Sequence, residues 1–291
     1  ACLGAGNYGA VCQAVDISSG EQVAVKRVPR GHCSEMAVKD ETSILRELSG
    51  SAPHRNIIGL KGVYADAGAW YIVMELARGR ELYERLVTQG MLTQAQARAV
   101  LHQLACAVAH LHAHATVHAD IKPENVLLHE EEEDNAAASA EQRCGDGGSG
   151  SSGGSGLSVK LVDFGSAFRV GTGPPKRKEW SYTAVYSPPE VVAGTAEASA
   201  AGDVWALGVV AYILLLGVHP FDPSGDTCEA EVLRRVVSAE PDYDDPAWDL
   251  IDAGAKDLVQ GALNKDPALR PTAAQLLAHP WVAAAAAACT E

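Results

Sequence analysis

The residues of this sequence best suited to chemistry lie at 117–128, where Asp120, Lys122 and Asn125 stand close together between apolar residues. Phosphoryl transfer needs little covalent help from a protein. It needs a group that orients the attacking hydroxyl, a cation near the moving phosphate and ligands for a metal ion. Asp120, Lys122 and Asn125 could fill these roles in that order. The alternative is a helix-to-strand turn whose Asp, Pro and Asn serve backbone geometry, and the segment alone leaves both interpretations open.

A glycine-rich pattern lies at the start of the chain, with Gly4, Gly6 and Gly9 spaced as Gly-x-Gly-x-x-Gly. Glycines allow a backbone to lie closely over phosphate oxygens with its amide hydrogens turned toward them. A single match is weak evidence for nucleotide binding. A dinucleotide-binding fold would open a helix at the third glycine, whereas residues 11–15 here predict a strand.

Two further charged residues suit a phosphate site. The alternating stretch 22–28 predicts a strand that presents Lys26, in a segment of the type that places a lysine on nucleotide phosphates. The alternative is a surface lysine at a strand end. Residues 36–48 have the apolar spacing of an amphipathic helix, which makes Glu41 the candidate ion-pair partner of Lys26.

Asp163 follows a short apolar stretch that predicts a strand and directly precedes Phe164 and Gly165. Magnesium is a hard cation that prefers carboxylate oxygen. Asp163 is therefore a candidate ligand for a magnesium ion that bridges nucleotide phosphates.

The elements that must position these residues fall into two groups. Residues 1–76 predict a small β-rich lobe with one helix, closed by a strand at 70–76, and residues 77–81 predict a joint. The larger part is helical, and the almost wholly apolar stretch 203–216 predicts its buried centre. Other helices are predicted at 93–114, 230–238, 255–263 and 272–278.

The helix predicted at 93–114 carries His110 and His114, whose spacing would place two imidazoles on one face for zinc. No cysteine or carboxylate ligand set accompanies them. Histidines on the helix surface or at the helix end are the favoured interpretation.

Two stretches have low-complexity composition. Residues 130–156 begin with an acidic run and continue into Gly and Ser, a composition that cannot bury enough apolar surface to offset its ordering entropy. We expect a disordered insertion there; an acidic docking element is the alternative. Residues 283–291 predict a low-complexity tail or a helix end.

The overall composition narrows the class of protein. The 291 residues are 47% hydrophobic and carry a net charge of −14, which argues against nucleic acid or an anionic membrane as a partner and favours basic substrates. Seven cysteines without a Cys-x-x-Cys pair predict reduced thiols, and hence a cytoplasmic or nuclear protein. No apolar run approaches the roughly 18 residues that a membrane span needs, and no signal peptide is found, although the chain opens without Met.

Taken in order, these motifs resemble those of the eukaryotic protein kinase family. The resemblance covers residues 3–282 and includes Val-Ala-Val-Lys at 23–26, Asp-Ile-Lys-Pro-Glu-Asn at 120–125, Asp-Phe-Gly at 163–165 and Pro-Pro-Glu at 188–190. It implies an α+β, bilobal fold over residues 1–282, with a β-rich lobe at 1–76, a helical lobe at 80–282, and ATP and Mg²⁺ between them.

The resemblance assigns roles residue by residue. It implies that Asp120 orients the substrate hydroxyl or accepts its proton, that Lys122 steadies the γ-phosphate, and that Asn125 and Asp163 hold magnesium. Lys26 would contact the α- and β-phosphates, with Glu41 as its partner. The remaining nucleotide-site residues implied are Leu3, Gly4, Gly6, Gly9, Val11, Ala24, Met74, Glu75, Ala77, Glu81, Glu124 and Leu127.

Lys122 in the 120–125 motif and Thr183 resemble the residues found at these places in serine/threonine kinases, so the substrate hydroxyl is implied to be that of Ser or Thr. The C-terminal part, including Lys265-Asp266-Pro267-x-x-Arg270, resembles the calcium/calmodulin-dependent and plant-type calcium-dependent branch. Arg270 would pair with Glu190 as a structural bridge. In this branch Glu81 and Glu124 would meet an arginine upstream of the target hydroxyl, so a basic protein substrate is implied. No EF-hand pattern occurs, and calcium control would lie in a calcium-sensing region outside this chain or in calmodulin.

The sequence departs from the family pattern at four places. Ala119 replaces the arginine that clamps an activation-loop phosphate, and Glu179 stands where many relatives carry a phosphorylated threonine. These two residues predict a loop that needs no activating phosphate at that site. Ser187-Pro188-Pro189-Glu190 replaces the common Ala-Pro-Glu ending. The first strand is nearly absent before Leu3, and the insertion precedes Asp163.

Two other classes of protein remain. A pseudokinase scaffold would keep the fold and bind nucleotide without turnover, but every catalytic role has a candidate residue. A small-molecule kinase would share the lobes, but the segment around Thr183 favours a protein substrate.

Overall fold

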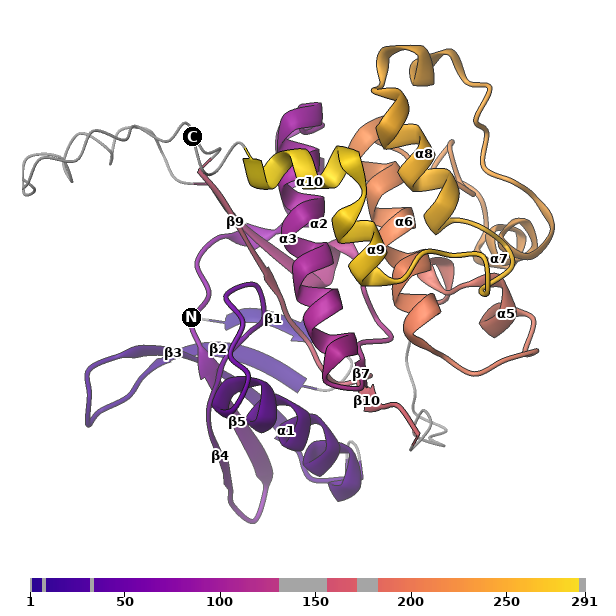
Figure 1. Cartoon of the computed structure of the whole chain (residues 1–291). Helices are drawn as coiled ribbons and strands as arrows, with labels where there is room; N and C mark the ends of the chain where they lie inside the picture. The colour runs from indigo at the N-terminus through magenta and orange to yellow at the C-terminus, as the bar shows by residue number, and fades with distance from the viewer. Residues whose placement is uncertain (1, 7–8, 32–33, 131–155, 172–182, 288–291) are drawn as a thin grey trace, which may run out of the picture.

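The computed structural model of the protein describes residues 2–6, 9–31, 34–130, 156–171 and 183–287. A sheet with one long helix forms the N-terminal lobe, and a larger group of helices forms the C-terminal lobe (Figure 1). This arrangement confirms the predicted α+β, bilobal fold. The predicted insertion at 130–156 lies almost entirely outside the described residues, as does Glu179.

The N-terminal lobe is an antiparallel sheet in the order β1-β2-β3-β5-β4. Its strands are β1 Cys2–Gly6, β2 Gly9–Val15, β3 Gln22–Pro29, β4 Leu60–Ala65 and β5 Ala69–Glu75. Only Cys2 of β1 precedes Leu3, as expected, and the rest of this strand is the start of the glycine-rich segment, which pairs with β2.

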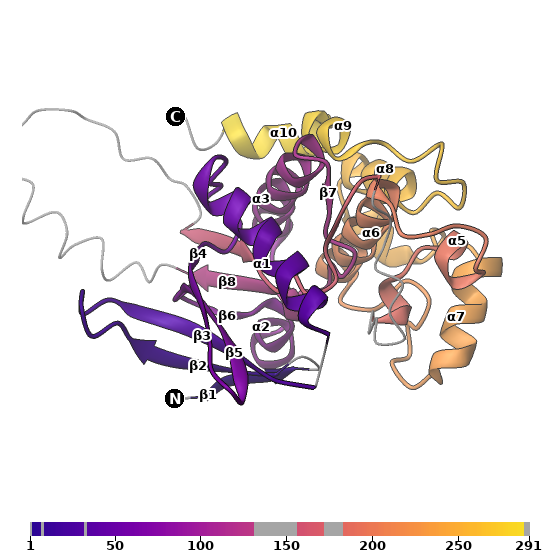
Figure 2. The same cartoon turned by 90° about the horizontal axis from the view of Figure 1, so that it is seen from below.

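Helix α1 (Glu35–Gly50) lies against this sheet (Figure 2). It begins where the Ser34 side chain accepts a hydrogen bond from the Ala37 N–H, which satisfies one of the free donors of the first turn. Its apolar face, with Ile44, Leu45 and Leu48, is buried. The helix thereby carries Glu41 toward the sheet.

Most helices belong to the C-terminal lobe. They are α2 Leu82–Gln89, α3 Gln94–Ala113, α5 Pro189–Val192, α6 Ala200–Leu216, α7 Glu229–Ser238, α8 Ala253–Ala262, α9 Ala273–Ala278 and α10 Pro280–Ala287. Short 3-10 helices lie at Pro123–Asn125, Ala184–Tyr186 and Pro246–Leu250. Within the described residues, no helix has both the length and the apolarity needed to span a membrane.

Helix α6 is the buried centre of this lobe, as its apolar sequence predicts. Twelve of its seventeen residues are buried, Trp205 fully. It begins at Ala200, three residues before the predicted start, and ends where Gly217 takes a left-handed conformation (φ 76°). Helices α3 and α8 pack against it.

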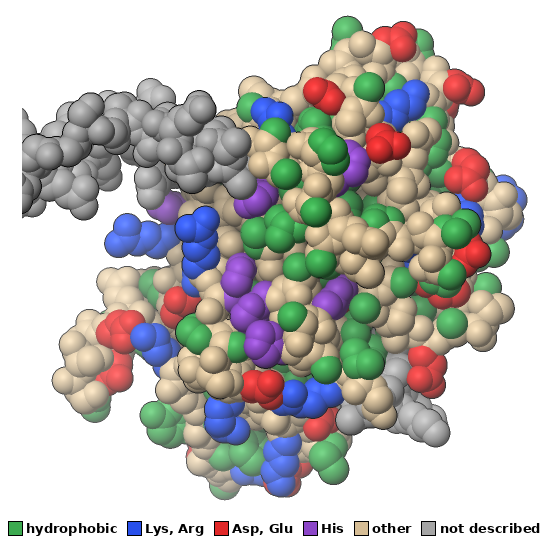
Figure 3. All heavy atoms as spheres, viewed as in Figure 1, with side chains coloured by type: hydrophobic (Ala, Val, Ile, Leu, Met, Phe, Trp, Pro, Cys, Tyr) green, Lys and Arg blue, Asp and Glu red, His purple; other side chains and the backbone are tan. Residues whose placement is uncertain are grey.

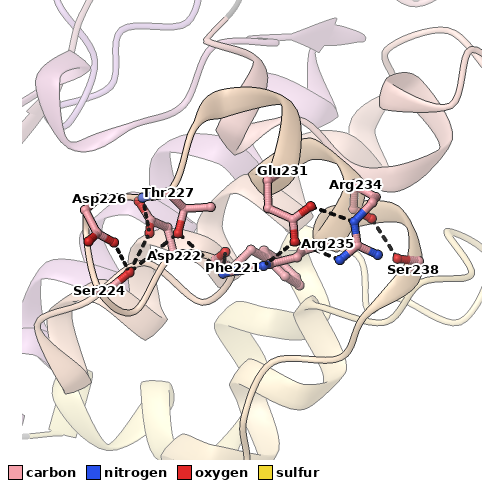
Figure 4. Close-up of polar contacts among 9 residues, drawn as sticks. All are labelled: Phe221, Asp222, Ser224, Asp226, Thr227, Glu231, Arg234, Arg235 and Ser238. Atoms are coloured by element: carbon pink, nitrogen blue, oxygen red, sulfur yellow. Dashed lines mark hydrogen bonds and ion pairs between the residues drawn. The ribbon is translucent and has the colours of Figure 1, made fainter.

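Helix α10 runs into the stretch predicted as a tail. The low-complexity composition at 283–287 therefore forms a helix end, because Ala is the best helix former. The loop before α7 is held by Asp222, whose carboxylate accepts a hydrogen bond from the N–H of Thr227 (Figure 4). The same carboxylate accepts a hydrogen bond from the N–H of Gly225.

Two small sheets bring the polar segments of the sequence together. One has the order β6-β8-β9, with β6 Arg80–Glu81, β8 Val126–Glu130 and β9 Leu157–Leu161. The other pairs β7 (Thr116–Val117) with β10 (Phe168–Arg169). Residues 118–125 therefore leave β7 and enter β8, while Asp163 lies between β9 and β10.

Candidate active site

A cavity of about 400 Å³ lies between the sheet and the residues that follow α3. Most of the residues predicted for a nucleotide site line it. They are Leu3, Gly9, Val11, Ala24, Lys26, Glu41, Met74, Glu75, Ala77, Glu81, Asp120, Lys122, Glu124, Asn125, Leu127 and Asp163. The predicted Gly4 and Gly6 lie in β1, in register with Val11 and Gly9 of β2. The lining also includes residues that sequence reasoning missed, namely Leu45, Ile58, Leu76, Val162 and Phe164.

Lys26 joins two segments at one end of the cavity. Its Nζ lies 2.7 Å from Glu41 Oε1 and 2.9 Å from Asp163 Oδ1. Burial lowers the pKa of Lys26, but the two carboxylates outweigh burial and raise the pKa above its ordinary value. Burial likewise raises the pKa of Asp163, and Lys26 more than reverses this effect. Lys26 and Asp163 are therefore both charged.

A second polar cluster surrounds Asp120. Lys122 Nζ lies 3.0 Å from Asp120 Oδ2 and donates a 2.5 Å hydrogen bond to Thr183 Oγ1. The Thr183 N–H donates to Asp120 Oδ1 over 3.4 Å. The Asn125 amide nitrogen donates to Asp120 O (2.7 Å) and to Asp120 Oδ2 (2.9 Å). The structure thus brings Thr183, 63 positions away in sequence, to the aspartate as predicted.

Asp203 of α6 anchors the backbone just before Asp120, a role that sequence reasoning did not assign. Its carboxylate accepts hydrogen bonds from the N–H groups of His118 (2.9 Å) and Ala119 (2.8 Å), and lies 2.9 Å from His112 Nε2. The signal available in the sequence is an acid in the first turn of an otherwise apolar helix. Such a buried charge requires partners.

Glu75 lines the cavity at the end of β5, but its side chain is engaged elsewhere. The carboxylate accepts a hydrogen bond from the Gly59 N–H (3.0 Å) and pairs with Lys160 of β9. A nucleotide would therefore meet the backbone of this segment and not the Glu75 carboxylate. Gly79, just beyond, has φ 99°, and a Cβ there would lie 2.2 Å from Leu128 O. Glycine is thus required where the chain crosses β8.

Comparison with known proteins matches residues 1–282 to the protein kinase domain. The chain belongs to the protein kinase family.

Curated relatives support the assignment. "Serine/threonine-protein kinase PKZ1" of Phytophthora infestans is 38% identical over 291 residues, covering 98% of this chain and 70% of the relative. "CDPK-related kinase 5" of Arabidopsis thaliana is 36% identical over 289 residues, covering 96% and 43%. "Calcium/calmodulin-dependent serine/threonine-protein kinase 1" of Oryza sativa subsp. japonica is 33% identical over 286 residues, covering 96% and 43%. The present chain is therefore a serine/threonine protein kinase and spans less than half of its plant relatives' length.

Glu81 and Glu124 of the kinase line the same cavity. Burial raises the pKa of Glu81, and the charge of Glu124 raises it further. Oε2 of Glu124 is buried and has no hydrogen-bond partner among the described residues. Two neighbouring carboxylates, one with an unsatisfied buried oxygen, form a site that favours a cation.

The predicted bridge between Arg270 and Glu190 is confirmed. Two guanidinium nitrogens lie 2.8 and 2.7 Å from the two oxygens of Glu190, and the Arg270 side chain is fully buried. The bridge holds the segment after Thr183 against the C-terminal lobe.

Histidines gather on one face of the kinase (Figure 3). The ring centroids of His110 and His114 lie 4.4 Å apart, and those of His54 and His110 lie 4.9 Å apart. The nitrogens meet carbonyls: His110 Nε2 lies 2.9 Å from Ala52 O, and His114 Nδ1 lies 2.8 Å from His110 O. Within the described part of the chain, no group of three or more His, Cys, Asp or Glu residues could hold a metal ion. Tilted ring contacts and hydrogen bonds to carbonyl oxygens account for these histidines.

Proposed function

We propose that the kinase transfers the γ-phosphoryl group of Mg-ATP to serine or threonine hydroxyls of basic protein substrates. The observation that carries this proposal is the cluster of Asp120, Lys122, Asn125 and Thr183, which adjoins the same cavity as Lys26. The cluster combines a proton acceptor (Asp120), a cation beside it (Lys122) and oxygens that could bind a metal ion, in a space that is large enough for a nucleotide.

Apolar residues line the part of the cavity that would hold the adenine base of the nucleotide. Val11 and Ala24 of the sheet face the same space as Leu127 of β8, and Met74 closes it at β5. The Lys26 ammonium, held by two carboxylates, is fixed in a position to meet phosphate oxygens.

The residues also fit a magnesium ion. Asp163 is ionised, and its side chain is 37% exposed. The Asn125 amide nitrogen is engaged with Asp120, so its oxygen is the atom available to a cation. When bound, the ion would neutralise charge on the phosphates.

The proton of the attacking hydroxyl would pass to Asp120. Asn125 and Thr183 fix the orientation of its carboxylate, and Lys122 keeps a positive charge beside it. This preorganised arrangement costs little rearrangement when charge develops on the moving phosphoryl group.

Glu81 and Glu124 supply the preference for a basic substrate. A guanidinium upstream of the target hydroxyl would pair with both carboxylates and satisfy the buried Glu124 oxygen. The net charge of −14 would also draw basic substrates at long range. The names of the two plant relatives point to calcium or calmodulin, and we propose that any such control lies outside these residues.

The test is phosphate transfer from Mg-ATP to a Ser peptide with an upstream Arg, beside a Tyr-for-Ser peptide and a peptide with Ala in place of Arg. We expect transfer to the Ser peptide only, and a KM about tenfold higher without Arg. Asp163→Ala should abolish transfer, whereas Asp249→Ala, at an exposed residue of a short 3-10 helix, should not change it. ATP binding without transfer would favour the scaffold alternative.

A further inference from the structure

The two segments that meet at Lys26 meet again at a second pair of charges. Six residues after Glu41 on α1 stands Glu47, and six residues after Asp163 stands Arg169 on β10. Arg169 Nη2 donates a 2.5 Å hydrogen bond to Glu47 Oε2. The same helix and the same post-Asp163 segment are thus joined at two points, once through Lys26 and once directly.

The Arg169 end of this contact is tied to the catalytic loop. Arg169 is in register with Thr116 of β7, and Phe168 with Val117. The N–H of Val170 donates to Ala115 O over 2.7 Å. Since β7 leads directly into residues 118–125, a shift of α1 relative to β10 is also a shift relative to Asp120.

The contact is charged on both sides. The hydrogen bond from Arg169 lowers the pKa of Glu47, the charge of Arg169 lowers it further, and His114 at the end of α3 contributes less. The two side chains are 35% and 37% exposed. Ion pairs with this exposure add little to global stability, so removing the pair should leave the fold intact.

We propose that Glu47 and Arg169 are positioning residues that hold α1 against the Asp163 segment, so that Glu41 and Asp163 engage Lys26 together. The inference rests on the proposed phosphoryl transfer, because it concerns the geometry of that site. Ala119 stands where the family carries an arginine that clamps an activation-loop phosphate, so this clamp is absent at residue 119. The ion pair between Glu47 and Arg169 joins α1 to β10 without a phosphate.

The experiment is a double-mutant cycle with Arg169→Ala, Glu47→Ala, their double variant and the exchanged pair Glu47→Arg with Arg169→Glu. We expect each single variant to lower kcat about two- to fivefold, with the peptide KM unchanged, and the double variant to lose no more than either single one. The exchanged pair should restore most of kcat.

Arg234→Ala is the matched control. Arg234 pairs with Glu231 at 2.7 Å within the single helix α7 (Figure 4), so it joins no two segments. Its loss should leave kcat unchanged. Additive effects of the two single variants, or an exchanged pair no better than Arg169→Glu alone, would overturn the proposal.

Hydrogen exchange supplies a readout that is independent of activity. Arg169→Ala and Glu47→Ala should speed exchange of the α1 amides, residues 35–50, whereas Arg234→Ala should not. Unchanged α1 exchange in both variants would refute the positioning role. A wild-type kinase without transfer would refute the proposed function instead, and the exchange data would still decide the role of this pair.

Discussion

Ala119 is held in a left-handed conformation by Asp203. Its φ is 62°, and its N–H donates a 2.8 Å hydrogen bond to Asp203 Oδ1. For a residue with a Cβ this conformation costs about 1–2 kcal/mol. The carboxylate also receives the N–H of His118, so two consecutive peptides before Asp120 are fixed by one buried acid of α6.

Replacing Ala119 by glycine should stabilise the kinase. Glycine removes the strain but adds about 0.4–1 kcal/mol of freedom to the unfolded chain, so we expect a net gain of about 0.5 kcal/mol in urea unfolding, with kcat unchanged. Ala99→Gly is the control, because Ala99 lies inside α3 and should lose about 1 kcal/mol. Equal losses at both positions would show that residue 119 is not strained.

Arg270→Lys should destabilise the kinase by about 3 kcal/mol. The guanidinium meets both Glu190 oxygens, donates to Asn264 O and lies 5.0 Å from the Trp205 ring centroid. An ammonium can reproduce only part of this buried network. Arg234→Lys, at an exposed pair, should change the free energy of unfolding by less than about 0.5 kcal/mol. A loss at 270 no greater than at 234 would contradict the structural role of the bridge.

Gly9→Ala should weaken ATP binding. Gly9 has φ 142°, and a Cβ there would lie 2.1 Å from Arg27 O, so β2 and β3 must separate. We expect the KM for ATP to rise about tenfold, because β2, which carries Val11 of the cavity lining, is displaced from β3. Gly20→Ala is the matched control: it also has positive φ (73°) but no atom within 4 Å. It should cost stability without changing this KM, and a similar KM change in both variants would rule out the clash as the cause.

Binding of an Arg-containing peptide should weaken in acid at a higher pH than an ordinary glutamate would give. Burial and Glu124 raise the pKa of Glu81 above 4.5. As pH falls through this raised pKa, Glu81 gains a proton and loses its attraction for the guanidinium, so the peptide KM rises. The KM of Glu81→Gln should be higher throughout and lack this step. A wild-type step at or below pH 4.5 would show that Glu81 does not bind the arginine.

Periodicity and motifs predicted the site well where the signal is local. The strand carrying Lys26 and the helix carrying Glu41 were found within a residue or two of their observed ends, because each has a buried face with its own repeat. The extent of β1 was not predicted, since glycines carry no apolar pattern and this strand forms only through pairing with β2.

What the sequence could not reveal are contacts between distant segments. Asp203 and Ala119 are 84 positions apart, and Arg169 and Glu47 are 122 apart. No periodicity links such residues; only the packing of α6 beneath the loop and of α1 beside β10 brings them together. Glu75 was predicted to line the site, but the ion pair between its carboxylate and Lys160 could not be predicted, because it depends on β9 lying alongside β8.

The pairing of Glu130 with Leu157, where β8 ends and β9 begins, determines how short the connection between these strands can be. Two antiparallel neighbours lie only about 5 Å apart, a gap that a two-residue turn can close. Loop-closure entropy changes by about 0.6 kcal/mol for each halving of length. A two-residue turn is therefore long enough to join Glu130 to Leu157, so the pairing of β8 with β9 does not itself require a longer connection.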